Sequence, residues 1–188
     1  MKKPDVIRTP HLVLKALADG DRGPFLRLCG DAQIKKTYML PDFDSAAQAD
    51  AFFDRIRALS MSKERFVYGI YLGETVIGML NDCGISGKKI ELGYFIAPEH
   101  WNRGYASEAL GAAVDELFSM GFETVVAGYF AENPASRRVM EKCGMRPLAE
   151  ESVIAYRGKD HVCYFCGIAA RDRENGNGEK DDGIQESV

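Results

Sequence analysis

The chain has 188 residues, of which 46% are hydrophobic and 28% charged, and its formal net charge at pH 7 is −4. These values are typical of one globular domain with a substantial core, and the lack of a lysine- or arginine-rich stripe argues against a nucleic-acid partner. No apolar run is long enough to span a membrane, and no signal-peptide hydrophobic region follows the polar N-terminus. We therefore expect a cytoplasmic protein with no membrane partner.

The N-terminal third of the chain predicts one strand followed by helices. Residues 6–18 alternate apolar and polar side chains, which is the pattern of a half-buried strand. The segment 24–39 has the composition of one or two short helices. Ser45 followed by Gln48 forms a capping-box pattern, so we expect a helix that starts there and reaches roughly residue 59.

Three strand-like segments come next and predict an antiparallel meander. Residues 66–72 and 75–85 are apolar runs joined by a short glycine-containing turn, which is the pattern of a hairpin. A second turn leads into residues 91–96, an apolar strand that Pro98 ends because proline has no N–H to donate. A further strand is expected at residues 124–129.

The turn after residue 96 has the features of an anion-binding site. Apolar side chains recur at helical spacing from Ala106, so the turn leads into an amphipathic helix that ends near Gly121. The N–H groups at a helix start carry the positive end of the helix dipole, and phosphate is their usual ligand. Gly104 lets the backbone approach such a phosphate, and Arg103 adds a positive charge. Many helices begin with glycine and alanine without binding a ligand, so the turn alone does not establish a site.

A second helix is marked at both ends. Asn133 and Pro134 have the side chains preferred at a helix N-cap and at the first helical position, and Gly144 suits the C-terminal end. Ser136 falls in the first turn, where the simplest role for its hydroxyl is a hydrogen bond to its own backbone. Two more strands are expected beyond this helix, around a turn at residues 157–160.

The cysteine and histidine residues do not predict a metal site. The five cysteines accompany no export signal, so we expect reduced thiols. Cys163 and Cys166 have zinc-like spacing, but no second ligand pair lies near them, and strand positions three apart face opposite ways. Cys143 falls on the apolar stripe of its helix, so it is expected in the core rather than as an acyl-cysteine nucleophile.

The last 18 residues differ in composition from the rest of the chain. Residues 171–188 have no periodic apolar pattern and carry three basic and six acidic side chains. We expect a disordered acidic tail there, after a single domain that spans residues 1–170.

The turn and the second helix together carry a resemblance to a known family. Residues 101–106 resemble the acyl-CoA pyrophosphate loop of the GCN5-related N-acetyltransferases, in which Arg or Gln, two residues and Gly are followed by one residue and Gly or Ala. The longer segments 98–110 and 133–145 are similar to the ribosomal-protein N-acetyltransferase (RimJ/RimL) branch. Trp101 departs from the first position of the loop motif, but tryptophan is common in that branch.

The resemblance implies an α/β (α+β) fold with a mixed, mostly antiparallel sheet of about seven strands and helices on both faces. In that fold the strands at residues 91–96 and 124–129 splay apart, and the pantetheine arm of acetyl-CoA lies between them. The resemblance implies that these residues contact the cofactor: Phe95, Ile96, Ala97, Trp101, Asn102, Arg103, Gly104, Tyr105, Ala106, Ser107, Asn133, Ser136 and Arg137.

The implied chemistry is direct attack of an amine on an acetyl thioester, which needs a base for the amine and a donor for the leaving sulfur. Glu91 is the first candidate for the base, directly or through a water, although it also suits a solvent-facing strand position. Glu150 and Glu151 are alternatives. Met140 occupies the position where many family members have a donor tyrosine, so the resemblance assigns the leaving sulfur to Ser136.

Three hypotheses about function follow. The chain is an acetyl-CoA-dependent N-acetyltransferase that acts on a protein or peptide N-terminal amine, or the same enzyme acting on a polyamine, amino acid or aminoglycoside. The third hypothesis is a CoA-binding regulatory module without turnover. A dinucleotide-binding domain fits poorly, because Gly104 lacks the companion glycines of that motif. We expect a monomer or homodimer.

Overall fold

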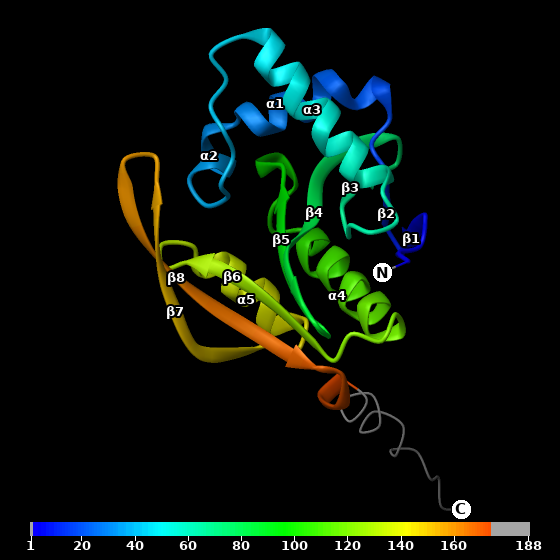
Figure 1. The fold of residues 1–188 in the computed structure, drawn as a ribbon, viewed down its shortest axis with the longest axis vertical. Helices are drawn as coiled ribbons and strands as arrows, with labels where there is room; N and C mark the ends of the chain where they lie inside the picture. The colour runs from blue at the N-terminus through cyan, green and yellow to red at the C-terminus, as the bar shows by residue number, and fades with distance from the viewer. Residues whose placement is uncertain (1, 174–188) are drawn as a thin grey trace, which may run out of the picture.

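One sheet of eight strands runs through residues 2–173, the part of the chain that the computed structural model describes (Figure 1). The strands are β1 (Val6–Arg8), β2 (Leu12–Lys15), β3 (Tyr68–Leu72), β4 (Thr75–Ser86), β5 (Lys89–Ile96), β6 (Thr124–Phe130), β7 (Arg146–Tyr156) and β8 (Lys159–Ala169). Their spatial order is β1-β2-β3-β4-β5-β6-β8-β7. All neighbouring pairs are antiparallel except β5 and β6, which are parallel. The prediction of a mixed, mostly antiparallel sheet is confirmed.

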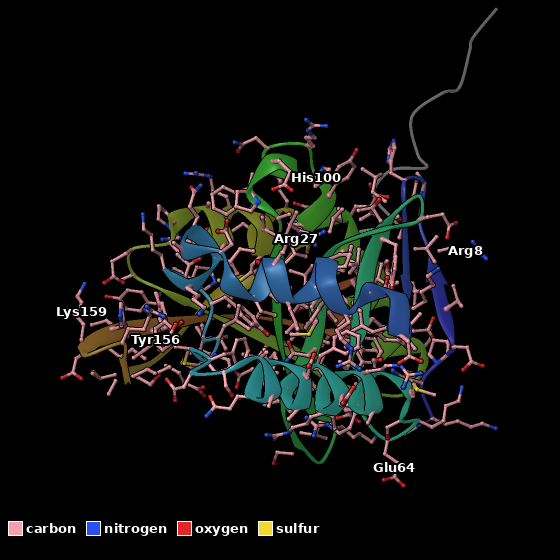
Figure 2. The ribbon with its side chains drawn as sticks, turned by 90° about the horizontal axis from the view of Figure 1, so that it is seen from above. Arg8, Arg27, Glu64, His100, Tyr156 and Lys159 are labelled. Atoms are coloured by element: carbon pink, nitrogen blue, oxygen red, sulfur yellow. The ribbon has the colours of Figure 1, made fainter. Side chains whose placement is uncertain are left out.

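Helices cover both faces of the sheet. They are α1 (Arg22–Gly30), α2 (Ala32–Lys35), α3 (Ala46–Met61), α4 (Tyr105–Ser119) and α5 (Pro134–Lys142), with short 3-10 turns at Asp19–Asp21 and Pro98–His100. One buried cluster joins Leu92 of β5 to Leu110 and Met140 of α4 and α5. The other joins Phe95 of β5 to Phe25 and the rest of the α1–α3 layer. Figure 2 shows α1 and α3 running beside each other over the second face.

The eighth strand comes from the N-terminal segment, where one strand was expected over residues 6–18. The structure instead forms a hairpin, with Val6 opposite Lys15. Pro10 lies in the turn, where its missing N–H costs no strand hydrogen bond. Thr9 closes the turn, because its N–H donates to the Leu12 carbonyl at 3.0 Å and its Oγ1 accepts from the Leu12 N–H at 2.9 Å.

The predicted helix starts are confirmed by their caps. Ser45 Oγ accepts from the Gln48 N–H at 3.2 Å, and α3 continues to Met61, slightly beyond the expected end. Asn133 Oδ1 accepts from the Ser136 N–H at 3.2 Å at the start of α5. Gly144 follows α5 with φ +82°, a left-handed conformation that favours glycine.

Strands β5 and β6 separate halfway along, as the family resemblance implies. They pair from Lys89 opposite Thr124 to Leu92 opposite Ala127, and no further. Strand β6 stays paired with β8 as far as Phe130, whereas β5 stays paired with β4 up to Ile96. The two strands therefore diverge within an otherwise continuous sheet (Figure 1).

The first residues of the expected tail are ordered against the domain. Residues 170–173 form a helical turn. Arg173 pairs with Asp115 of α4 at 2.7 Å and donates to the Cys143 carbonyl at 3.0 Å. The domain therefore extends to Arg173, and the rest of the expected tail, residues 174–188, lies outside the described residues. Within the described chain, no helix combines the length and apolar composition needed to cross a membrane.

Replacing Asp82 with alanine is expected to lower the free energy of unfolding by about 2 kcal/mol, because a buried N–H and a guanidinium lose their acceptor. The Asp82 side chain is 3% exposed; it accepts from the Phe66 N–H at 2.9 Å and from Arg65 Nε at 2.6 Å. Urea unfolding measures the effect. Asp5→Ala is the control, since Asp5 is 85% exposed where it pairs with Lys63, and a change within about 0.5 kcal/mol is expected. Equal effects of the two substitutions would contradict the prediction.

Candidate active site

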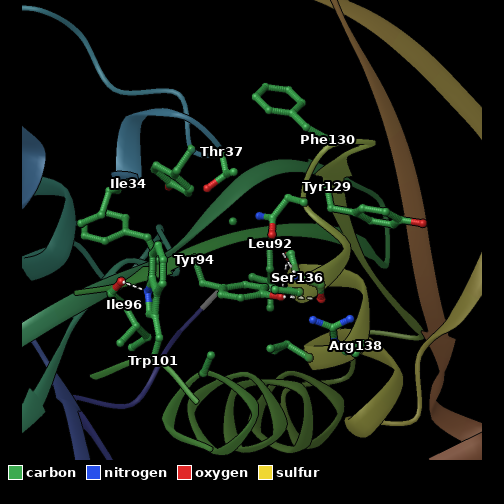
Figure 3. A pocket seen from close by; sticks show the side chains of 18 of the residues that line it. Ile34, Thr37, Leu92, Tyr94, Ile96, Trp101, Tyr129, Phe130, Ser136 and Arg138 are labelled. Carbon is green, nitrogen blue, oxygen red and sulfur yellow. Dashed lines mark hydrogen bonds between the residues drawn. The ribbon is translucent and has the colours of Figure 1, made fainter. Parts of the chain in front are cut away.

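A cavity of about 730 Å³ lies where β5 and β6 diverge (Figure 3). Its wall includes residues from α2 and the segment after it, from β4, β5, β6 and β8, from the turn before α4, and from α5. Residues from both layers of helices therefore line the cavity.

Successive residues of β5 line opposite sides of the cavity. Leu92 and Ile96 belong to the cluster packed against α4 and α5, and Tyr94 packs against the same cluster. Phe95 belongs to the cluster of α1–α3. A side chain at Gly93 would lie within 3.3 Å of the Tyr38 ring, on that same α1–α3 side. Because alternate side chains of a strand point to opposite faces, the cavity passes through the sheet and has an α4–α5 side and an α1–α3 side.

The turn before α4 borders the α4–α5 side. Gly104 has φ +85°, and a Cβ there would meet no heavy atom within 4 Å. Its conformation and the open space beside it suit the approach of a phosphate to the first N–H groups of α4. Five predicted cofactor residues of this segment line the cavity with Gly104, namely Trp101, Asn102, Tyr105, Ala106 and Ser107. Arg103 is exposed on the same turn and is not part of the cavity wall.

Trp101 closes the end of β5. Its indole Nε1 donates to the Ile96 carbonyl at 2.7 Å, and the Ala97 N–H donates to the Ile77 carbonyl at 2.7 Å (Figure 3). Ala97 does not line the cavity, whereas Phe95 and Ile96 do. Since hydrogen-bonding directions alternate along a strand, the Ile96 N–H and the Tyr94 carbonyl point toward the diverging β6. These are the backbone groups placed to bind an extended arm.

The first turn of α5 brings Ser136 to the cavity. Its hydroxyl oxygen lies 2.9 Å from the Tyr94 hydroxyl, which is also 3.2 Å from the Ser136 carbonyl oxygen (Figure 3). The hydroxyl thus bonds to another element rather than to its own helix. Burial raises the pKa of Tyr94. Sequence reasoning did not identify Tyr94; its only signal was that it shares a strand face with Leu92 and Ile96.

The two arginines of α5 face different ways. Arg137 Nε binds Glu141 Oε1 at 2.8 Å on the helix surface and does not line the cavity. Arg138 and Lys142 do line it, and Figure 3 shows Arg138 below Ser136. The resemblance assigned Arg137 as well as Arg103 to the cofactor, whereas Arg138 is the arginine of α5 that lines the cavity. One residue along a helix turns the side chain by about 100°, which is why adjacent arginines diverge.

Glu91 lies on the other side of the sheet from Ser136. It lines the cavity and is half-buried, and burial raises the pKa of its carboxyl group, partly offset by Lys89. Among the described residues, its carboxylate makes no hydrogen bond. Glu150 and Glu151 are exposed on β7 and do not line the cavity. Of the three carboxylates considered from the sequence, Glu91 alone is placed to act inside the cavity.

The α1–α3 side is lined mostly by apolar and aromatic side chains. They include Phe130, Ile154 and Phe165, with Cys83 and Cys163 beside them. Within residues 2–173, Glu91 is the one acidic side chain of the cavity wall, whereas Lys36, Arg138 and Lys142 are basic.

Tyr156 of the β7–β8 hairpin binds the segment after α2, which lines the α1–α3 side of the cavity. The Tyr156 hydroxyl accepts from the Leu40 N–H at 3.2 Å and lies 3.2 Å from the Tyr38 carbonyl oxygen. Figure 2 places Tyr156 in the β7–β8 hairpin, at the opposite end of the molecule from Arg8 of β1. The Tyr38 hydroxyl in turn donates to Asn81 of β4. The segment after α2 is therefore hydrogen-bonded both to β4 and to the β7–β8 hairpin.

No three His, Cys, Asp or Glu side chains of the described chain are grouped so that they could hold a metal ion. Cys163 lines the cavity, whereas Cys166 is buried in the cluster beneath α4 and α5. The two thiols therefore lie on opposite faces of β8.

Comparisons with known proteins agree with this architecture. The family model of the acetyltransferase (GNAT) domain matches residues 11–146. The chain is 30% identical over 146 residues to the uncharacterized N-acetyltransferase YoaA of Bacillus subtilis (strain 168), covering 75% of this chain and 82% of that protein.

Two solved structures share the fold at lower identity. One is a RimL ribosomal L7/L12 alpha-N-protein acetyltransferase, with TM-score 0.76 and 18% identity, covering 87% of this chain and 93% of that one. The other is spermidine N-acetyltransferase from Vibrio cholerae in complex with CoA and spermine, with TM-score 0.74 and 20% identity, covering 88% and 99%. The chain belongs to the GNAT family and is an acetyl-CoA-dependent N-acetyltransferase.

Proposed function

We propose that this enzyme acetylates the N-terminal amine of a protein or peptide, by direct attack of the amine on the acetyl thioester in a ternary complex. The observation that carries the proposal is the cavity that passes through the sheet. Its α4–α5 side has the turn with Gly104, where we expect the phosphates of acetyl-CoA to bind, and Ser136, and its α1–α3 side has Glu91. Donor and acceptor can therefore enter from opposite faces and meet between β5 and β6.

The cavity thiols support direct attack over a cysteine intermediate. Desolvation of the thiol inside the cavity, together with the nearby carboxylates of Glu91 and Asp82, raises the pKa of Cys83 to about 12, and burial raises that of Cys163. Both remain protonated at neutral pH, and a thiol is a far weaker nucleophile than a thiolate. Cys143 is buried against α4, where its Sγ donates to the Ser107 carbonyl at 3.3 Å, and it does not line the cavity.

Glu91 suits an α-amine better than an alkyl amine. An α-ammonium has a pKa of about 8, whereas an alkyl ammonium such as that of lysine has a pKa of about 10.4. Each pKa unit corresponds to about 1.4 kcal/mol, so a carboxylate removes the α-ammonium proton at a cost lower by about 3 kcal/mol. The proton transfer to a single carboxylate is therefore easier from the first kind of amine than from the second.

The charges of the cavity also disfavour a polyamine or aminoglycoside. A polycation needs several acidic partners, whereas Glu91 is the one acidic side chain in the described cavity wall. The apolar residues around it suit an uncharged or apolar first residue of a peptide. A small-molecule amine is nevertheless the second candidate, because the V. cholerae enzyme of the same fold is a spermidine N-acetyltransferase.

An acceptor panel tests the proposal. Short peptides with a free and a formylated N-terminus are compared with spermidine, an aminoglycoside and free amino acids, by the release of CoA thiol. We expect the free peptide to have the highest kcat/KM, at least roughly tenfold above spermidine as the proton-transfer difference implies. The formylated peptide with an internal lysine should be inactive. Faster turnover of spermidine would overturn the acceptor class, and parallel rather than intersecting double-reciprocal plots would overturn direct attack.

A further inference from the structure

The contact between Tyr94 and Ser136 joins two elements in the wall of the cavity. Tyr94 comes from β5 beyond the point where β5 leaves β6, and Ser136 comes from the first turn of α5. The hydroxyl oxygens are 2.9 Å apart, within ordinary hydrogen-bond distance. Both residues line the cavity on its α4–α5 side.

Two neighbours hold the serine in place. Its N–H donates to Asn133 Oδ1 at 3.2 Å, and its carbonyl oxygen lies 3.2 Å from the Tyr94 hydroxyl. Among the described residues, Tyr94 is the hydrogen-bond partner of the Ser136 hydroxyl. The direction in which the serine proton points is therefore decided by how these two hydroxyl groups share their protons.

Two proton arrangements are available to the pair. If Ser136 donates to Tyr94, the serine proton is used within the protein and the phenol donates to the Ser136 carbonyl. If Tyr94 donates to Ser136 Oγ, the serine proton is free to point into the cavity. Burial raises the pKa of Tyr94, so the phenol keeps its proton at neutral pH and remains a donor.

We propose that Tyr94 is a positioning residue, whose hydroxyl donates to Ser136 and thereby directs the serine proton at the leaving sulfur. The inference rests on the proposed function. During transfer the C–N bond forms and the C–S bond breaks with its electron pair going to sulfur, where the Ser136 hydroxyl donates a hydrogen bond. Hydrogen bonds in a chain polarise one another, so donation from Tyr94 makes Ser136 a better donor.

Neither hydroxyl loses its proton in this step. A thiol has a pKa of about 8.5 and a phenol one of about 10, so net transfer from tyrosine to thiolate is uphill even before burial is considered. The proton that leaves the amine goes to Glu91, and the thiolate is neutralised afterwards from solvent. The tyrosine therefore orients and strengthens a donor and is not itself an acid.

A double-mutant cycle tests the inference. The variants are Tyr94→Phe, Ser136→Ala and the double mutant, with kcat and both KM values measured against acetyl-CoA and the best acceptor. We expect each single variant to lower kcat by about 100- to 1,000-fold, the size of one lost donor, with each KM changed less than about threefold. The double mutant should be no slower than Ser136→Ala, because the tyrosine acts through the serine.

Tyr68→Phe is the matched control. Tyr68 is buried in the cluster against which the partly buried Tyr94 packs, and its hydroxyl donates to the Pro4 carbonyl at 2.7 Å, outside the cavity. It should lose a comparable amount of stability in thermal unfolding and keep its kcat. A similar fall in kcat in Tyr68→Phe would mean that loosened packing explains the effect, and would overturn the inference.

The outcomes separate the inference from the function on which it rests. An unchanged kcat in Ser136→Ala would show that the serine does not donate to the leaving sulfur, which contradicts the proposed function and the inference together. If kcat falls in Ser136→Ala but stays normal in Tyr94→Phe, the inference alone is overturned. The same holds if the losses of kcat in the two single variants add up in the double mutant. If Tyr94→Phe does not fold, 3-fluorotyrosine at position 94 keeps the ring and lowers the phenol pKa. Because a more acidic phenol donates a stronger hydrogen bond, kcat at neutral pH should rise above that of the wild type, and an unchanged or lower kcat contradicts the role.

Discussion

Replacing Glu91 with glutamine is expected to lower kcat/KM by about 10²- to 10⁴-fold, the usual contribution of a general base. The carboxylate is the one acidic group that the described chain places in the cavity, and it lies on the α1–α3 side, from which we propose that the acceptor enters. Glutamine preserves the size of the side chain and cannot take a proton. Steady-state kinetics with saturating acetyl-CoA measure the effect.

A pH profile tests whether Glu91 is the base. Burial raises the pKa of its carboxyl group, so the acidic limb of kcat/KM should lie above the ordinary glutamate value of about 4.3. This limb should disappear in Glu91→Gln. Glu150→Gln is the control, because Glu150 is exposed on β7 outside the cavity, and it should keep both the rate and the limb. Loss of activity in Glu150→Gln with normal turnover by Glu91→Gln would refute the assignment.

The same substitution should not destabilise the protein. A carboxyl group whose pKa is raised on folding binds more protons in the folded state than in the unfolded state between the two pKa values. The folded state is therefore weakened as pH rises through that window, and ionised Glu91 opposes folding at neutral pH. We expect the free energy of unfolding of Glu91→Gln at pH 7 to equal or exceed that of the wild type, as measured by urea unfolding.

Replacing Gly104 with glutamate is expected to weaken acetyl-CoA binding by more than about 100-fold. A side chain there projects into the open space beside the first turn of α4, where the phosphates are expected to lie. Two like charges 4 Å apart near a protein surface repel by about 4 kcal/mol, and each 1.4 kcal/mol is a tenfold change in Kd. Isothermal titration calorimetry with acetyl-CoA measures the loss.

Gly87→Glu is the control for backbone strain. Gly87 has φ +57° in the turn between β4 and β5, and a Cβ there also meets no heavy atom within 4 Å. Both substitutions place a non-glycine residue at positive φ, at a cost of about 1–2 kcal/mol of stability. Only Gly104→Glu should lose acetyl-CoA binding. Full affinity in a folded Gly104→Glu would show that the turn before α4 does not bind the phosphates.

Much of the fold was predictable because its signals are local. The N-caps at Ser45 and Asn133 form hydrogen bonds within three residues, and the glycines at 104 and 144 adopt the positive φ that their turns require. The order of strands and helices was predicted correctly from periodicity and turns. The exception is the N-terminal hairpin, because the alternating pattern continues through Pro10 and hides the turn.

Sequence alone also identified the cavity segments, but not how they combine. Ser136 and Glu91 were named as catalytic candidates, and the structure places them on opposite sides of the sheet because one is on α5 and the other on a β5 position facing α1–α3. The choice of Arg138 over Arg137 depends on the rotation of α5 against the sheet. A packed helix presents one set of side chains to the cavity, and sequence spacing does not reveal which.

The sequence by itself determined the caps, the glycine turn, the element order and the family resemblance, because each depends on residues close together in the chain. Only the tertiary structure decided at which residue β5 and β6 diverge, that Arg173 packs on Asp115, and that Tyr94 contacts Ser136. That last contact joins residues 42 positions apart. It exists because the strand and the helix pack against the same cluster, and such packing reflects the whole core rather than any short segment.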